Sequence, residues 1–476
     1  MRELGVIELR EKIKAGEIRS VDITQEYIQA IKQSKTNAII EIFADAIEQA
    51  QEIDKKIQQG YTGKLAGVPI IIKDNILVEG KHASAGSLFL KDYIAQYTST
   101  VAQKLLDEGA VILARANMDE FAMGSGTEHS AYFKTYNPLD TTRVPGGSSG
   151  GSAAAVIENL CAAALGTDTG GSIRQPSSYC GVVGMKPTYG RVSRYGVVAF
   201  ASSLDQVGPI TKNVQDNALL LEILAGTDIH DETTARNQVI DFSSRIGKSL
   251  QGLKVGIVQS VDAMVQGLDV ESHYEKMKEF LQQHGATLVN VQIPHLQLVL
   301  PAYYIIAPAE AASNLARFDG VKYTSRSQNA QTLNEIYTLS RTEYFGDEVK
   351  RRIMLGNYVL SSGYFDAYYN KARSVQAQLR EEYIKAFQSC DVILMPTAKG
   401  EAYKIGEKAN PLDAYKEDIF TVSANIAGLP AISIPFGVGN HKLPIGMQFL
   451  APHFEEKTLY QVASYVEKHK EDIHGV

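Results

Sequence analysis

The chain has 476 residues and a mildly acidic balance, with 47 Lys and Arg against 54 Asp and Glu, or a formal net charge of -7. Hydrophobic residues make up 44% and charged residues 21%, as in an ordinary globular protein. This balance excludes a protein that holds nucleic acid through its overall charge, because phosphate binding requires a basic face.

The cysteine content and the N-terminal sequence favour a cytoplasmic protein. Three cysteines occur, Cys161, Cys180 and Cys390, and none forms a C-x-x-C pair, which is typical of a reducing compartment. The first twenty residues lack the apolar run of a signal peptide. No apolar stretch approaches the length of a membrane span, so we expect no membrane association.

The N-terminal third of the chain predicts alternating helices and strands. After Ser20, apolar residues recur three and four positions apart through Ile31, which predicts a helix. The apolar, β-branched run in residues 65–75 predicts a buried strand. A helix over 99–109 and a second strand over 111–114 follow. This alternation is typical of an α/β fold with a buried, partly parallel sheet.

The later elements continue the alternation. They are a strand at 252–260, helices at 273–284 and 366–389, and strands at 392–396 and 431–436. Residues 143–195 are rich in Gly and Ser but contain apolar runs of helix and strand length, unlike a flexible linker. We find no repeat, and we predict one domain over 1–476.

Lys73 stands at the end of the apolar run VPIII. It has two interpretations. A lysine at a strand end can extend its amine to water. If the amine is buried instead, desolvation lowers its pKa and makes it a usable base near neutral pH.

Two glycine-rich segments follow. In residues 143–156, four glycines surround Ser148 and Ser149 before a predicted helix, whose first N–H groups are free. In residues 165–181, the sequence Thr-Gly-Gly-Ser ends at Ser172 and could turn successive N–H groups toward an oxyanion. Each segment alone could also be an ordinary glycine-rich turn.

Other interpretations of these segments are weaker. The G-x-x-x-x-G-K-[ST] pattern of a phosphate loop is absent. Residues 146–150 match the G-x-S-x-G nucleophile elbow, but that elbow follows an apolar strand, and the residues before it here are polar with two prolines. We find no metal-ligand motif, and therefore expect no metal site in this chain.

Together, GVPIIIKDN (67–75), GGSSGGSAAA (146–155) and the segment 166–209 resemble the amidase signature family in content and order. The resemblance implies one α/β domain whose mixed central sheet is covered on both sides by helices, with a signature core at about 60–210. It also implies that Ser172 is the nucleophile, that Ser148 relays the proton and follows a cis peptide bond, and that Lys73 is the base. The predicted oxyanion-hole donors are the N–H groups of Thr169, Gly170 and Gly171, with that of Ser172 beside them.

Within this family, the likeness is strongest to members that hydrolyse glutamine as one component of a tRNA-dependent amidotransferase. It extends nearly end to end, through residues 117–125, 303–323, 348–369 and 418–437. The resemblance implies that ammonia converts Glu-tRNA(Gln), or Asp-tRNA(Asn), into the amidated tRNA. It further implies a heterotrimer with B and C subunits, in which the mischarged tRNA, ATP and magnesium bind to the partner and this chain needs no cofactor.

Glutamine carries an α-carboxylate and an α-ammonium, so its site requires one cation and one anion. The resemblance places Arg352 and Asp418 in these roles, with Tyr303 nearby. Arginine suits a carboxylate because its planar fork donates two hydrogen bonds. Arg351 is the competing candidate for the carboxylate. A surface salt bridge for Arg352 and a helix cap for Asp418 are the structural alternatives.

The chain departs from the family pattern in residues 125–139, a stretch that borders the active site in the family. Gly126, His129, Phe133 and Leu139 stand where Ser, Asn, Gly and Trp are usual. Loop packing and substrate contacts are therefore in question there. The alternative function is a stand-alone amidase that acts on another small amide.

Overall fold

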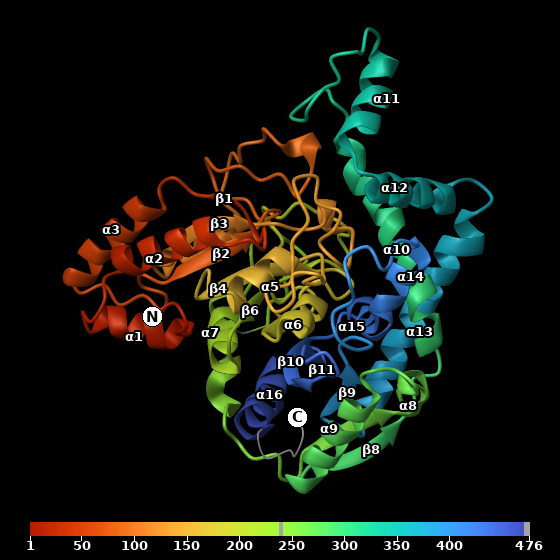
Figure 1. The fold of residues 1–476 in the computed structure, drawn as a ribbon. Coiled ribbons are helices and arrows are strands. Elements are labelled where there is room, and N and C mark those ends of the chain that lie inside the picture. The colour runs from red at the N-terminus through yellow and green to blue at the C-terminus, as the bar shows by residue number, and fades with distance from the viewer. Residues whose placement is uncertain (238–240, 471–476) are drawn as a thin grey trace.

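A single continuous sheet forms the centre of the molecule. The computed structural model describes residues 1–237 and 241–470. Within them, the strand order is β1-β3-β2-β4-β6-β5-β10-β11-β9-β7-β8 (Figure 1). The strands are β1 (Ile39–Ile42), β2 (Pro69–Lys73), β3 (Val111–Ala116), β4 (Ala163–Asp168), β5 (Val183–Lys186), β6 (Gln206–Thr211), β7 (Lys254–Val258), β8 (Thr287–Val291), β9 (Val392–Pro396), β10 (Ala431–Val438) and β11 (Pro444–Leu450).

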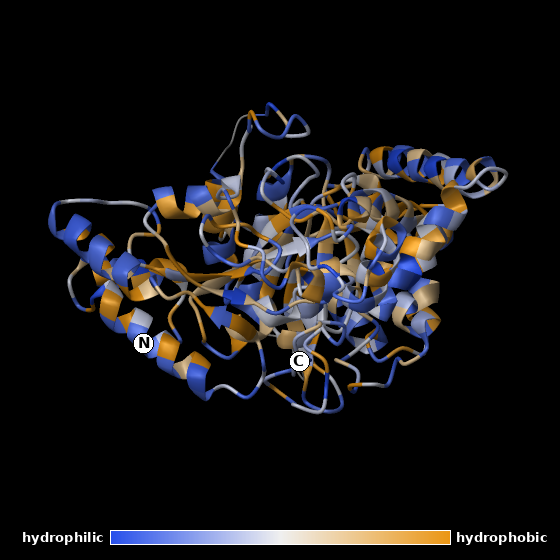
Figure 2. Ribbon diagram, turned by 90° about the horizontal axis from the view of Figure 1, so that it is seen from above, coloured by the Kyte–Doolittle hydropathy of each residue, from blue (hydrophilic) through white to orange (hydrophobic). Residues whose placement is uncertain are grey.

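Helices lie against both faces of this sheet (Figures 1 and 2). They are α1 (Val6–Lys14), α2 (Ser20–Gln33), α3 (Ala46–Gln58), α4 (Thr100–Asp107), α5 (Gly150–Ile157), α6 (Arg174–Cys180), α7 (Val214–Leu224), α8 (Gln259–Val265), α9 (Glu271–Gln283), α10 (Val299–Asn314), α11 (Leu333–Tyr344), α12 (Asp347–Leu360), α13 (Lys371–Ala386), α14 (Pro411–Tyr415), α15 (Val422–Ala427) and α16 (Glu456–His469). Among the described residues, none of these helices combines the length and apolar character needed to cross a bilayer.

The sheet is mixed, as the sequence predicted. Strand β2 pairs in parallel with β3 and β4, and β7 pairs in parallel with β8 and β9, whereas the other pairings are antiparallel. All five residues of β2 are buried, which explains their uninterrupted apolar sequence before Lys73. The prediction of a mixed α/β fold is therefore confirmed.

Helices predicted from the spacing of apolar residues are present in the structure, as α2 and α4 show. Helix α2 begins at Ser20 and buries Ile23 and Tyr27 toward the core. Helix α4 begins after Ser99, whose side chain accepts a hydrogen bond from the Ala102 N–H and so caps the first turn. The outer helices are striped blue and orange in Figure 2, as expected for helices that turn one face toward a buried sheet and the other toward solvent.

One predicted helix differs from the observed one. The sequence favoured an uninterrupted helix over 366–389, but residues Phe365–Asn370 form a π-helical turn and α13 begins only at Lys371. The π-helical turn buries none of its residues, so no apolar face of regular α-helical spacing is packed into the core there.

Helices α10 and α12 form a pair at one side of the sheet, with α11 standing away from the body at the upper right of Figure 1. Gly356 of α12 approaches the carbonyl oxygen of Pro308 so closely that a Cβ would clash. This contact fixes how α12 crosses α10. It also fixes the direction in which the first turns of α12 present their side chains.

Candidate active site

Lys73 is the last residue of β2 and is fully buried. Its Nζ lies 2.7 Å from Ser148 Oγ and 2.8 Å from Ser149 Oγ. Thr167 Oγ1 is a third neighbour, at 2.9 Å. Burial lowers the pKa of Lys73 to about 7, against an opposing effect of Asp119 and two other aspartates. Much of this amine is therefore neutral near neutral pH, and a neutral amine can accept a proton.

Ser148 is positioned by the glycine turn before α5. The Gly147–Ser148 peptide bond is cis. The Gly147 N–H donates to Gln175 Oε1 at 2.9 Å, and the Asp119 N–H donates to the Ser148 carbonyl oxygen at 3.3 Å. A Cβ on Gly147 would clash with the Asp119 carboxylate, so only glycine fits. These contacts hold the Ser148 hydroxyl against Lys73.

Ser172 lies in the turn between β4 and α6. The Ser149 N–H donates to the Ser172 carbonyl oxygen at 3.1 Å, which joins the two serine segments. Ser172 is 8% exposed, and its Oγ forms no hydrogen bond with any part of the chain that the structure describes. The structure thus brings the three predicted residues into one region, and of the two serines predicted to be catalytic it links only Ser148 directly to Lys73. Catalytic hydrogen bonds often tighten only when substrate binds.

Asp168 shapes this turn and was not singled out from the sequence. Its carboxylate accepts hydrogen bonds from the Gly171 N–H at 2.9 Å and from Arg174 Nε at 3.0 Å. Burial alone would raise the pKa of Asp168, but the neighbouring Arg174 lowers it to about 2. The sequence could have indicated this ion pair, because Asp168 and Arg174 are the charged residues at the two ends of the uncharged segment 169–173.

The predicted oxyanion donors are not equivalent in the structure. The Gly171 N–H is occupied by Asp168, which folds back over the turn. Thr169 is held through its side chain, whose Oγ1 donates to Asp205 at 2.6 Å. In the described part of the chain, the N–H groups of Thr169, Gly170 and Ser172 have no acceptor. These three groups are therefore available to a ligand in the present geometry, and that of Gly171 is not.

Asp418 is buried near the turn that carries Ser172. Its two oxygens accept hydrogen bonds from Ser125 Oγ at 2.9 Å and from Tyr304 O–H at 2.7 Å. Burial raises the pKa of Asp418 to about 6. Tyr303 lies against Gly170, where a Cβ would clash with its hydroxyl. Tyr303 therefore contacts the turn that carries Ser172. Asp418 is joined to that turn through Thr421, whose Oγ1 donates to the carbonyl oxygens of Asp418 and Gly170.

Arg352 and Arg351 have different environments. The Arg352 side chain is 4% exposed and donates through Nε to Glu348 Oε1 at 2.7 Å. Its guanidinium carbon lies 5.2 Å from the ring centre of Tyr415 and 5.4 Å from that of Tyr304. The Arg351 side chain is 46% exposed and pairs with the other oxygen of Glu348. Of the two arginines, Arg352 is the one enclosed in the site.

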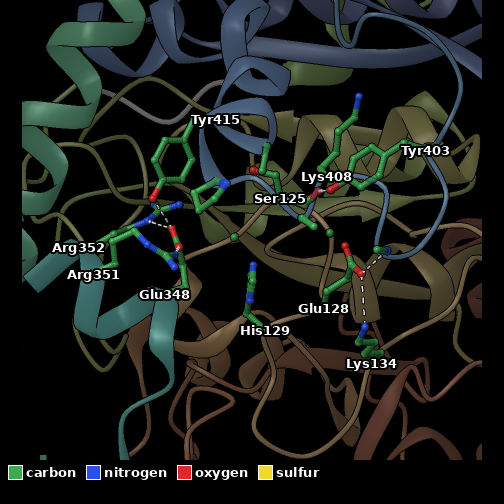
Figure 3. A pocket seen from close by; sticks show the side chains of 16 residues that line it. Ser125, Glu128, His129, Lys134, Glu348, Arg351, Arg352, Tyr403, Lys408 and Tyr415 are labelled. Atoms are coloured by element: carbon green, nitrogen blue, oxygen red, sulfur yellow. Dashed lines mark hydrogen bonds and ion pairs between the residues drawn. The ribbon is translucent and has the colours of Figure 1, made fainter. Parts of the chain in front are cut away.

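A cavity of about 320 Å³ opens beside these residues (Figure 3). Its lining residues are Gly124, Ser125, Gly126, Glu128, His129, Lys134, Glu348, Arg351, Arg352, Tyr403, Gly406, Lys408, Ala409, Pro411, Ala414 and Tyr415. The lining includes Arg351 and Arg352, but Ser172, Asp418 and Tyr303 are not among the lining residues. Ser125 connects this cavity with the glycine turn that carries Ser148. Its carbonyl oxygen accepts a hydrogen bond from Gln175, the same side chain that holds Gly147.

The divergent stretch 125–139 does border this cavity. Gly126 and His129 line it, and the His129 ring points toward its centre in Figure 3. Leu139 lies at the surface, 47% exposed. The departures at 126 and 129 therefore alter the cavity wall, whereas that at 139 does not.

Sequence reasoning also missed Glu348, Tyr304 and Tyr415. The spacing of Glu348 and Arg352, four residues apart on one helix, was a usable signal for an ion pair. No local pattern connects Tyr415 with Glu348, because 67 residues separate them.

Comparison with known proteins gives one consistent result. The model of a family described as Amidase matches residues 22–460. The A subunit of glutamyl-tRNA(Gln) amidotransferase from Thermoanaerobacter pseudethanolicus is 50% identical over 466 residues, which cover 97% of this chain and 95% of that protein. The protein of the same name from Staphylococcus carnosus is 48% identical over 475 residues, covering 98% and 97%.

Solved structures agree. The crystal structure of the glutamyl-tRNA(Gln) amidotransferase A subunit from Thermotoga maritima has a TM-score of 0.81 and 41% identity, covering 98% of this chain and 95% of that one. Peptide amidase from Stenotrophomonas maltophilia has a TM-score of 0.83 and 30% identity, covering 98% and 97%.

Proposed function

This chain belongs to the amidase family, and from that premise we propose that it hydrolyses the side-chain amide of glutamine and supplies the ammonia to a tRNA-dependent amidotransferase. The relatives named as the A subunit of glutamyl-tRNA(Gln) amidotransferase, about half identical over nearly the whole length, support this assignment. The proposed nucleophile is Ser172, with Ser148 as proton relay and Lys73 as base.

The proposed reaction is acyl transfer. Ser172 Oγ attacks the amide carbon while its proton passes to Ser148 Oγ, and the Ser148 proton passes to neutral Lys73 Nζ. The N–H groups of Thr169, Gly170 and Ser172 stabilise the oxyanion. The returning proton allows ammonia to leave, and the same relay then activates the water that releases glutamate from Ser172. The lowered pKa of Lys73 supports the first step.

The observation that carries the choice of glutamine is one buried arginine and one buried aspartate held by the same tyrosine. Arg352 lies over the Tyr304 ring, and the Tyr304 hydroxyl donates to Asp418. A free amino acid presents a carboxylate and an ammonium with fixed spacing, so it satisfies both charges. A peptide amide has lost one of these groups, which disfavours the activity in the name of the Stenotrophomonas relative.

The remaining elements of the proposal concern the assembly. The word "subunit" in the relatives' names supports an amidotransferase built from several chains. We assign the B and C partners, the mischarged tRNA, ATP and magnesium to that assembly and not to this chain. A cytoplasmic location follows from this role in translation.

The test replaces Arg352 by Ala in the assembled complex. A lost hydrogen bond between charged groups costs about 1.5–3 kcal/mol, which lowers kcat/KM for glutamine by roughly ten- to a hundredfold. Free ammonia bypasses the glutamine site, so ammonia-dependent tRNA amidation should persist in the same preparation. Equal loss of both activities would mean that Arg352 supports folding or assembly, and the substrate assignment would be withdrawn.

A further inference from the structure

Glu348, in the first turn of α12, is a buried carboxylate that joins two arginines. Its Oε1 accepts hydrogen bonds from Arg352 Nε at 2.7 Å and from Tyr415 O–H at 2.8 Å, and its Oε2 pairs with Arg351 (Figure 3). Burial alone would raise the pKa of Glu348, but Arg352 and the hydrogen bonds from Arg352 and Tyr415 lower it. Glu348 therefore remains charged and keeps its hold on Arg352.

This contact decides which donors Arg352 can offer to a ligand. A guanidinium has five N–H donors in a planar fork. Glu348 occupies the Nε donor. Within residues 1–237 and 241–470, the two terminal nitrogens of Arg352 donate to nothing, and Arg352 lines the cavity. A carboxylate entering the cavity can therefore bind only end-on, through the two terminal nitrogens, and not through the side that includes Nε.

The same carboxylate also ties Arg352 to the opposite charge of the site. The Tyr415 and Tyr304 rings stack with centres 4.1 Å apart and planes 21° from parallel. Tyr415 donates to Glu348 at one end of this stack, and Tyr304 donates to Asp418 at the other. Glu348 therefore fixes one end of a rigid connection between Arg352 and Asp418.

We propose that Glu348 is a positioning residue that makes the site selective for amides with a free α-carboxylate, by fixing Arg352 in the end-on orientation and setting its distance from Asp418. This inference rests on the proposed function and deepens it. Glu348 acts through Arg352 and does not itself contact the substrate.

The test is Glu348→Gln in the full-length chain, purified with the subunits that it assembles with. The two probes are glutamine and butyramide, which has the same primary amide on a short chain but no charged group. A substitution that weakens binding equally in the ground state and the transition state raises KM and leaves kcat unchanged. We expect KM for glutamine to rise about tenfold, with kcat within about threefold and kcat/KM for butyramide within about twofold.

Two further variants separate positioning from general support of α12. Asp347→Asn makes the same chemical change one residue earlier, on a side chain that is 90% exposed and pairs with Lys350. Asp347→Asn should leave KM and kcat for glutamine and kcat/KM for butyramide unchanged. Tyr415→Phe removes one hydrogen bond to Glu348 but keeps the ring stack, and should raise KM for glutamine by about threefold.

The outcomes are distinct. An equal fall of glutamine and butyramide hydrolysis in Glu348→Gln would indicate a structural role and overturn the inference. An unchanged KM for glutamine in Glu348→Gln, with a raised KM in Arg352→Ala, would overturn the positioning role and leave the proposed function intact. If Arg352→Ala also left KM unchanged, or the wild type did not hydrolyse glutamine, both would be overturned.

Discussion

The two sides of the site are built in different ways. On the catalytic side, Lys73 and Ser148 are fully buried, and the backbone of β2 and of the glycine turn before α5 sets their positions. On the side proposed for substrate recognition, Arg352 and Asp418 are set by contacts between side chains, with Glu348 holding Arg352 and the stacked Tyr304 and Tyr415 lying between the two charges. In the proposed function, the backbone therefore fixes the catalytic groups, whereas specificity depends on side chains that can be replaced one at a time.

This difference predicts two kinds of mutational effect. A change on the catalytic side removes an interaction that exists in the transition state, and should lower kcat. A change on the recognition side removes binding that the ground state shares, and should raise KM. The variants below test that separation, beginning with the one of largest effect.

Ser172→Ala should reduce glutamine hydrolysis by about a thousandfold or more, because the attacking oxygen is lost. The fold should persist, since Ser172 Oγ donates to no group in the described residues and the change is small. Activity and thermal unfolding should be measured on the same preparation. A covalent acyl adduct trapped on Ser148 instead of Ser172 would reverse their assigned roles.

Lys73 predicts how the rate depends on pH. The base is the neutral amine, so kcat should fall about tenfold for each pH unit below a pKa of about 7 and level off above it. Lys73→Arg should be inactive, because a guanidinium does not lose its proton in this range. A flat kcat profile between pH 6 and 8, or activity of Lys73→Arg within a few-fold of wild type, would exclude the base role.

Asp418 provides the internal control for that profile. Its pKa of about 6 means that its carboxylate becomes protonated at a lower pH than Lys73 does. Losing this charge weakens binding of the substrate ammonium, so KM should rise below about pH 6, whereas the fall in kcat over the same range is due to Lys73. Plotting kcat and KM separately against pH therefore assigns the fall in kcat to Lys73 and the rise in KM to Asp418.

Sequence reasoning anticipated the local structure around Lys73, Ser148 and Ser172 better than the contacts around Arg352 and Asp418. Lys73, Ser148 and Ser172 each lie in a short segment whose glycines or apolar residues mark the local backbone, and the strand before Lys73 follows from its composition. The order of the eleven strands did not follow, because it depends on distant pairings such as that of β10 with β5. Such pairings leave no trace in a local pattern.

Two contacts that the sequence did not predict, at Gly171 and at Glu348, have a common physical origin. Gly171 was predicted to offer its N–H to a substrate, but Asp168 takes it, and that contact depends on how a side chain folds back over the turn. Tyr415 and Glu348 meet only after α12 and α14 have packed into the tertiary structure. Residue type and spacing identify a candidate donor, but they do not show which acceptor reaches it first.

Arg351 provides the smallest predicted effect and the sharpest comparison with Arg352. Both arginines pair with Glu348, but Arg351 is about half exposed and Arg352 is enclosed. An exposed ion pair contributes roughly 0–1 kcal/mol, and Arg352 keeps its own hydrogen bond to Glu348 when Arg351 is removed. Arg351→Ala should therefore raise KM for glutamine by less than about threefold, against roughly ten- to a hundredfold in kcat/KM for Arg352→Ala. The two variants should be compared at the same pH and salt concentration, since added salt weakens the exposed pair more than the buried one. If Arg351→Ala had the larger effect, the carboxylate would bind at the mouth of the cavity and not at its enclosed arginine, and the division into a rigid catalytic side and an aromatic recognition side would have to be redrawn around Arg351.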